Sequence, residues 1–243
     1  MRQTNGINLI AISPCPNDTF AFYNIIHKGN YTVDFLDIEE LNQALLNEKY
    51  SIAKGSFAIM EKIKQNYRVL SAGSAIGKGV GPVLVGKIAH GARIALPGIN
   101  TTAHKLFQFW EKRQRFKNLN LTQMPFYEML PALKKNTADA AVLIHEGRFV
   151  YKNAGLTLIE DLGAFWEKET RQMIPLGCIY VHKTIDQGAE NNFLKALQES
   201  IQKSQEAYKN QSALFKNSIL PYMQKMAQEK DDKVVVAHVD TYV

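Results

Sequence analysis

The chain has very little cysteine: Cys15 and Cys178 are the two thiols among 243 residues. So few thiols in a chain of this length suit a reducing compartment better than a disulfide framework. Neither cysteine belongs to a Cys-x-x-Cys pair, and no His-x-x-x-His spacing occurs. The sequence therefore offers no metal-ligand motif, and we expect no metal. Cys15 stands between Pro14 and Pro16 and is interpreted as a small turn residue rather than a reactive thiol.

Long apolar runs are also missing. No stretch of eighteen consecutive apolar residues exists, which excludes a transmembrane helix on sequence grounds. The start of the chain, Met1–Gly6, leads directly into a short apolar stretch and has no signal-peptide pattern. We therefore expect a cytoplasmic protein without a membrane partner.

Charge of one sign is not concentrated anywhere. The chain has 29 Lys and Arg against 23 Asp and Glu, a net charge of +6, and no basic cluster is interleaved with aromatic residues. This distribution argues against a nucleic-acid partner. A mild positive field favours a small anionic substrate, although a solvated, lysine-rich surface would give the same composition. The sequence does not indicate an oligomeric state.

Apolar segments with strand and helix patterns alternate along the chain, which predicts an α/β fold. The segment lengths indicate two lobes with a ligand cleft. We expect a terminal lobe formed by residues 1–88 and 179–243, with residues 89–178 inserted as a central lobe. The chain would cross near Ile88 and Cys178, and two crossings make a hinge that can close the cleft.

Local signals predict where several helices begin and end. Asn17 and Asp18 are expected to cap a first helix, which Gly29 would stop. Ser56 is expected to cap a later helix, and Thr101–Thr102 another. The segment Gly73–Gly81 is rich in glycine but lacks the spacing of a Walker A motif or a dinucleotide fingerprint, so we expect a tight loop and no nucleotide cofactor.

Four apolar strands are predicted to end in polar tips. Ligands of open α/β sheets bind outside the carboxyl ends of the strands, so these tips predict one small-molecule site. The tips are Ser13-Pro14-Cys15-Pro16-Asn17-Asp18, Lys54-Gly55-Ser56, Pro97-Gly98 with Thr101-Thr102, and His145-Glu146-Gly147.

The tip residues suggest chemistry. An imidazole at position 145 can accept a proton near neutral pH, or it can simply hydrogen-bond a loop. Ser56, Thr101 and Thr102 can cap helices, and a helix N-terminus can also hold a carboxylate. Lys54 can pair with an anion or lie in solvent. The available chemistry is proton transfer combined with anion binding.

Taken together, these motifs resemble the 1,4-dihydroxy-6-naphthoate synthase family of the futalosine route to menaquinone. The resemblance runs in order from about Ile7 to Val243. It rests on Ser13-Pro14-Cys15-Pro16-Asn17-Asp18-Thr19-Phe20, Lys54-x-Ser56-Phe57, Gly77-x-Gly79-x-Gly81-Pro82, Pro97-Gly98-x-x-Thr101-Thr102-Ala103 and Leu143-Ile144-His145-Glu146-Gly147.

The resemblance implies a two-lobed, periplasmic-binding-protein-like fold of type II. It implies a lyase that converts cyclic dehypoxanthinyl futalosine to 1,4-dihydroxy-6-naphthoate by base-catalysed elimination, without a cofactor. The family's general base falls on His145. Its substrate-binding segments fall on Lys54, Gly55 and Ser56 and on Thr101 and Thr102.

Two alternatives remain open at this point. The chain could be a chorismate dehydratase, an enzyme of similar fold in the same pathway. The Ser-Pro-Cys-Pro-Asn-Asp and His-Glu-Gly tips favour the naphthoate synthase. The chain could also be a non-catalytic protein that binds a carboxylate, for which a signal peptide or lipobox would be the distinguishing feature.

The missing metal motif gives a first testable expectation. Dialysis of the purified protein against EDTA should leave its rate of naphthoate formation unchanged, because no ligand-spaced set of Cys and His is present. The rate is measured by absorbance before and after dialysis. A lost rate that one added metal ion restores would contradict the expectation.

Overall fold

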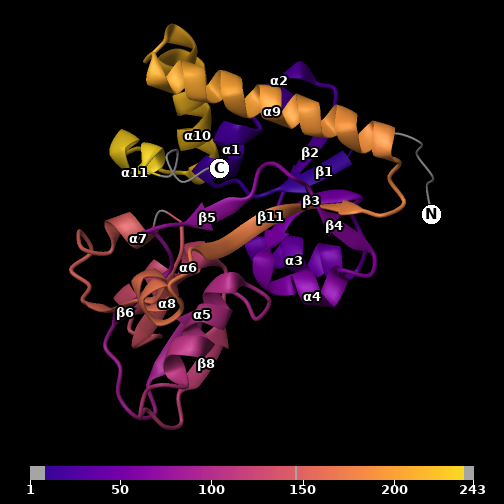
Figure 1. Ribbon diagram of the computed structural model, residues 1–243. Helices are drawn as coiled ribbons and strands as arrows, with labels where there is room; N and C mark the ends of the chain where they lie inside the picture. Colours follow the sequence, from indigo (N-terminus) through magenta and orange to yellow (C-terminus); the bar gives the residue numbers. More distant parts are fainter. Residues whose placement is uncertain (1–8, 146, 238–243) are drawn as a thin grey trace. The chain divides into compact units, whose positions relative to one another are not determined.

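Strands and helices alternate along the computed structural model, which describes residues 9–145 and 147–237. The predicted α/β class is confirmed. The chain divides into two units (Figure 1). The terminal unit contains the described residues up to Gly55, Ile59–Ala75 and those from Gly177 onward, and the central unit contains Ser56–Ala58 and Ile76–Leu176.

The first boundary between the units differs from the expected position near Ile88. The chain enters the central unit at Ala75–Ile76. The reason is β6 (Val83–Gly86), which pairs antiparallel with β9 (Ala140–Leu143) and so belongs to the central sheet. Residues 83–86 show a strand pattern in the sequence, but the pattern does not reveal the partner strand. The exit at Leu176–Gly177 lies close to the expected Cys178.

The sheet of the terminal unit has the order β2-β1-β3-β11-β4, with β5 paired to β11. β1 runs parallel to β2 and to β3, whereas β11 runs antiparallel to β4. The strands are β1 (Leu9–Ile12), β2 (Thr32–Phe35), β3 (Ile52–Ser56), β4 (Tyr67–Val69), β5 (Ala75–Gly77) and β11 (Ile174–His182). The predicted loop Gly73–Gly81 thus contains a short strand.

In the terminal unit, the long helix α9 (Gln187–Lys209) packs against α1 (Pro16–Ala21) and α2 (Tyr23–Lys28) (Figure 1). Ser200 joins them: its hydroxyl donates to the Ala21 carbonyl at 2.6 Å and accepts from the Asn24 N–H at 3.1 Å. The other helices of this unit are α3 (Ile38–Leu46), α4 (Met60–Ile63), α10 (Leu220–Ala227) and α11 (Asp232–Val236), with a π-helical turn at Phe215–Ile219.

Two predicted helix caps are wrong. Pro16 begins α1 after Cys15 without any side-chain cap, and the Asp18 carboxylate instead accepts hydrogen bonds from Ser13. Ser56 ends β3 and is followed by a 3₁₀ turn, Phe57–Ile59, rather than capping a helix. The predicted stop at Gly29 is confirmed, because this residue ends α2 in the left-handed conformation.

The sheet of the central unit has the order β10-β6-β9-β7-β8. β7 (Arg93–Leu96) runs parallel both to β8 (Asn120–Gln123) and to β9, whereas β6 and β10 (Leu158–Asp161) add antiparallel pairs. The carboxyl ends of β7, β8 and β9 therefore lie at one edge of this sheet.

Both faces of the central sheet are covered by helices. Ile94 and Leu96 pack in the same cluster as Phe107 of α5 (Thr102–Glu111), and α8 (Leu162–Thr170) lies in this layer. Ala95 packs on the opposite face with Met129 of α6 (Phe126–Lys134). The period of two in β7 separates the two layers. The short α7 (Gly147–Val150) follows β9.

Among the described residues, no helix combines the length and the apolar character that crossing a membrane requires.

Gly86 provides a test of the packing in the central sheet. Its φ is 110°, and a Cβ there would collide with the Asp139 carbonyl oxygen. Gly91 also has a positive φ, 78°, but a Cβ there would meet nothing within 4 Å. Gly91→Ala should cost on the order of 1 kcal/mol of unfolding free energy, because only the backbone is strained. Gly86→Ala should cost clearly more in urea unfolding, and equal losses would contradict the collision.

Candidate active site

The edge formed by the carboxyl ends of β7, β8 and β9 gathers the polar tips of the central unit. Thr101 and Thr102 follow β7, and His145 follows β9, its parallel neighbour. Phe126 follows β8 on the other side of β7. This is the edge at which open α/β sheets bind ligands.

His145 occupies a constrained position at this edge. Its φ of 49° lies in the left-handed region, which is uncommon for a residue with a side chain. Its ring lies edge-on to the ring of Phe126, with 5.0 Å between centroids and 70° between planes. Nε2 is buried and has no hydrogen-bond partner among the residues that the structure describes. Glu146, predicted beside it, lies outside the described residues.

An imidazole nitrogen that is buried without a partner is unusual, because buried polar atoms are normally paired. Among the described residues, none uses the lone pair or proton at this nitrogen. The alternative interpretation, in which the ring serves to hydrogen-bond its loop, has no support at Nε2.

Thr101 is the N-cap of α5, as predicted. Its Oγ1 accepts from the His104 N–H at 3.1 Å and donates to the Gly98 carbonyl at 2.8 Å. The Thr102 hydroxyl is also engaged, donating to the Leu176 carbonyl at 2.8 Å and accepting from the Ala58 N–H at 3.3 Å. Both hydroxyl protons are therefore used inside the protein.

The backbone of the same turn remains suited to an anion. The N–H groups of Thr102 and Ala103, in the first turn of α5, have no acceptor within the helix. Aligned peptide dipoles add a partial positive charge at this end. At this turn the free donors are thus backbone N–H groups rather than the threonine hydroxyls, which donate to Gly98 and Leu176.

Ser56 groups with the threonines rather than opposite them. The expected lobes place Ser56 in the terminal lobe, within residues 1–88, and Thr101–Thr102 in the central lobe, within residues 89–178. Ser56–Ala58 instead belong to the central unit, where the Ala58 N–H donates to Thr102. β3 therefore begins in the terminal unit, and its last residue, Ser56, belongs to the central unit, which also contains His145.

Lys54 forms a buried ion pair within the terminal unit. Its Nζ lies 3.2 Å from Asp18 Oδ1 and donates to the Gly73 carbonyl at 2.9 Å, and both charged side chains are at most 6% exposed. The second carboxylate oxygen of Asp18 accepts from the N–H and the hydroxyl of Ser13 at 3.1 and 2.7 Å. Lys54 therefore does not lie in solvent, and its charge is matched by Asp18.

Close packing requires glycine at position 55. A Cβ at this position would lie 2.5 Å from Leu45 Cδ1 and 3.1 Å from the ring of Tyr180. The absence of a side chain lets β3 pass these residues on its way to Ser56.

Both cysteines are buried. Cys15 is buried, with Sγ 2.7 Å from the Ser13 hydroxyl, as suits a turn residue. Burial raises the pKa of Cys178, and the nearby charge of Lys54 opposes this only in part. Cys178 therefore stays protonated at neutral pH and is a poor nucleophile.

Arg148 holds the segment after His145 in place. Its guanidinium donates to the Gly81 carbonyl at 2.6 Å and to Asp161 Oδ2 at 2.8 Å, which ties α7 to the glycine-rich segment and to the N-cap of α8. The arginine is committed to internal bonds and is not a free anion site.

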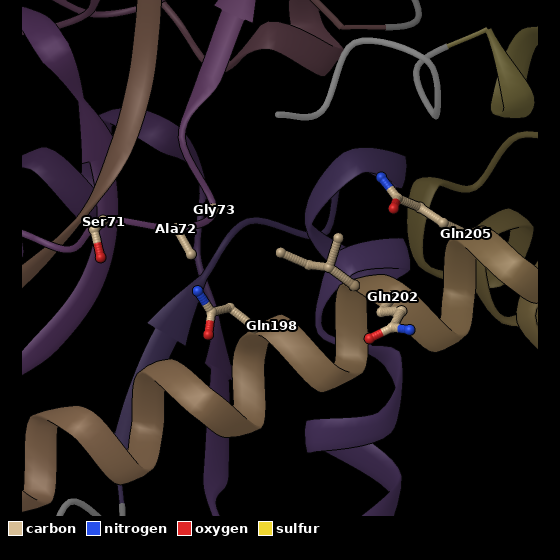
Figure 2. Close-up of a pocket in the computed structure, with 7 residues that line it drawn as sticks. Ser71, Ala72, Gly73, Gln198, Gln202 and Gln205 are labelled. Carbon is tan, nitrogen blue, oxygen red and sulfur yellow. The ribbon is translucent and has the colours of Figure 1, made fainter.

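A separate pocket of about 310 Å³ lies on the terminal unit (Figure 2). The loop after β4 and one side of α9 line it, and it contains none of the predicted site residues. Its lining consists of Ser71, Ala72, Gly73, Gln198, Ile201, Gln202 and Gln205. The amide and hydroxyl groups shown in Figure 2 carry no charge, so this pocket offers neither a base nor an anion site.

Sequence reasoning missed the contact of Phe126 with His145 and the ion pair of Asp18 with Lys54. Phe126 reads as the ordinary start of an amphipathic helix, and nothing local reveals its contact with His145 nineteen positions later. Asp18 reads as a helix cap. Within residues 9–145 and 147–237, no three His, Cys, Asp or Glu side chains form a group that could hold a metal ion.

The fold is that of periplasmic binding proteins. The chain superimposes on the aliphatic sulphonate binding protein SsuA from Escherichia coli with a TM-score of 0.65 at 10% identity, covering 97% of this chain and 79% of that one. It also matches the crystal structure of protein AF1704 from Archaeoglobus fulgidus, with a TM-score of 0.87 at 29% identity over 100% of this chain and 89% of that chain.

The sequence comparisons define the family. A family model described as menaquinone biosynthesis matches residues 9–243. A 1,4-dihydroxy-6-naphthoate synthase from Thermus thermophilus is 35% identical over 96% of this chain and 85% of the relative. One from Streptomyces coelicolor is 32% identical over 96% and 84%. The chain belongs to the menaquinone biosynthesis family and, within it, is related to these synthases; it is an enzyme.

The buried pair gives a stability prediction. Asp18→Asn removes the partner of a buried ammonium, which typically costs about 3–5 kcal/mol of unfolding free energy. Glu61→Gln removes the partner of the exposed Lys64 and should cost less than about 1 kcal/mol. Urea unfolding of both variants at neutral pH measures the difference. A similar small loss for Asp18→Asn would show that the pair does not stabilise the terminal unit.

Proposed function

We propose that this enzyme is a lyase that forms 1,4-dihydroxy-6-naphthoate from cyclic dehypoxanthinyl futalosine, with His145 as the general base. The observation that carries the proposal is the buried, unpaired Nε2 of His145 at the ligand-binding edge of the central sheet. The names of the relatives at 35% and 32% identity support the reaction.

The geometry of His145 suits a base. Its left-handed backbone turns the chain directly after β9, and the ring of Phe126 lies against the imidazole. A base held in one orientation can meet the proton that it removes, and base catalysis of this kind contributes about 10²–10⁴-fold to a rate. The substrate proton would transfer to the imidazole.

The substrate carboxylate would bind at the start of α5. The Thr101 and Thr102 hydroxyls fix this turn through their bonds to Gly98 and Leu176. The first-turn N–H groups would then contact the carboxylate oxygens, helped by the helix dipole. The two threonines thus act in substrate binding by shaping the turn rather than by donating their own protons.

Lys54, Gly55 and Ser56 complete the proposed binding segments. Lys54 acts through its pair with Asp18, which anchors β3, and the missing side chain of Gly55 lets the strand pass Leu45. Ser56, at the end of β3, lies in the unit that contains His145 and Thr102. The proposed partner is a small anionic molecule, and the reaction as written needs no metal or organic cofactor.

The proposed step balances without an external oxidant. The base takes a proton from the sugar-derived part of the substrate. The electron pair of that C–H bond forms a double bond while the bond to the leaving fragment breaks, and the leaving fragment departs with its pair. Aromatisation of the new ring drives the elimination.

Replacing His145 tests the proposal. His145→Asn should lower kcat for naphthoate formation by at least about 10²-fold, because it removes the base. The urea midpoint should stay close to that of the unchanged protein. The rate is followed by absorbance and mass, with cyclic dehypoxanthinyl futalosine as substrate. His90→Asn is the matched control, since His90 is exposed and accepts a hydrogen bond from the Lys117 N–H.

Three outcomes would count against the proposal. An unchanged kcat in His145→Asn would remove the role of this residue. Turnover of chorismate by the unchanged protein in place of the cyclic substrate would assign a dehydratase. Stable binding of the cyclic substrate without conversion would indicate a carboxylate-binding protein.

A further inference from the structure

We propose that Phe126 and Tyr127 form an aromatic wall beside His145 that binds the planar ring of an aromatic carboxylate substrate. This inference deepens the proposed function and rests on it for the role of His145. Tyr127 would contact the ring of the ligand, and Phe126 would position the imidazole.

The strand order brings this wall to the base. Both aromatic residues follow β8, whereas His145 follows β9, and β7 lies between these strands. Since β7 is parallel to both, the two tips emerge at the same edge. The centroid of the Phe126 ring lies 5.0 Å from that of the imidazole, and the Tyr127 ring lies 5.7 Å from Phe126 with 77° between planes. The rings thus form a continuous series that starts at the base.

Exposure points to a ligand. Tyr127 is 63% exposed, although a large ring gains by burial. The loop after β7, which leads to the proposed carboxylate site, carries Ile99 at 54% exposure. The start of α6 and the loop after β7 therefore present exposed apolar surface at the edge that carries His145 and the start of α5. Ligand sites combine such apolar surfaces with a few polar groups that fix orientation.

The chemistry selects a flat ligand. An aromatic ring offers its negative face to the positive edge of another ring, and offset or edge-on pairs are favoured. A saturated ring of the same size lacks this quadrupole and cannot lie flat. The wall therefore discriminates aromatic from saturated carboxylates, while the α5 N–H groups respond to the carboxylate that both share.

Binding of two carboxylates to the intact protein tests the wall directly. The probes are 2-naphthoate and decahydro-2-naphthoate, which share size and charge but differ in planarity, and isothermal titration gives their Kd values. The unchanged protein should bind 2-naphthoate roughly three- to tenfold more tightly than the saturated acid. Tyr127→Ser should remove most of this preference. Leu121→Ser, in the preceding strand β8 and 40% exposed, is the control that should keep it.

Kinetics with the cyclic substrate separate the two residues. Tyr127→Ser should raise KM several-fold with kcat nearly unchanged, because it removes binding that ground state and transition state share. Phe126→Leu should lower kcat by releasing the imidazole, and Phe126→Tyr, which restores a ring, should recover most of it. A Phe126→Leu enzyme with full kcat would overturn the positioning role.

The inference and the proposed function can fail separately. If Tyr127→Ser keeps the full preference for 2-naphthoate, or if the unchanged protein shows none, the wall is refuted even when His145→Asn is inactive. If His145→Asn is fully active but the preference for 2-naphthoate depends on Tyr127, the wall remains and His145 is not the base.

Discussion

The parallel pairing of β7 with β8 on one side and β9 on the other is the constraint on which the central site depends. The register pairs Leu96 with Gln123 and Ala95 with Ala141, so the three strands end close to one level. This pairing makes neighbours of three features: the helix start after β7, the aromatic pair after β8 and the imidazole after β9. Slipping one strand by a residue would move each of its side chains to the opposite face of the sheet, where a different layer of helices packs.

Features that depend on neighbours in the chain could be predicted from the sequence. The cap at Thr101, the stop at Gly29 and the strand that delivers His145 follow from residue type and local pattern, and the structure confirms them. The caps predicted at Asn17–Asp18 and at Ser56 followed the same rules and are wrong, because contacts with distant residues decide these positions. Asp18 pairs with Lys54, and Ser56 is the last residue of β3.

Features that depend on distant partners could not be predicted. The sequence shows that residues 83–86 form a strand, but only the pairing with β9 places it in the central unit. It shows an aromatic pair at 126–127, but only the strand order places Phe126 against His145. The fold itself does not decide function either, since the same architecture occurs in sulphonate-binding proteins. A binding protein needs affinity alone, whereas the proposed lyase also needs a base with an available nitrogen.

The three residues Ser56–Ala58 affect how the protein can be dissected. A gene fragment for residues 76–176 would encode the long segment of the central unit, yet it would omit the Ala58 N–H that donates to Thr102. The turn that starts α5 would lose one of the contacts that shape it. Expression of the isolated unit would therefore need a graft of this tripeptide, and a circular permutant should not open the chain within residues 56–58.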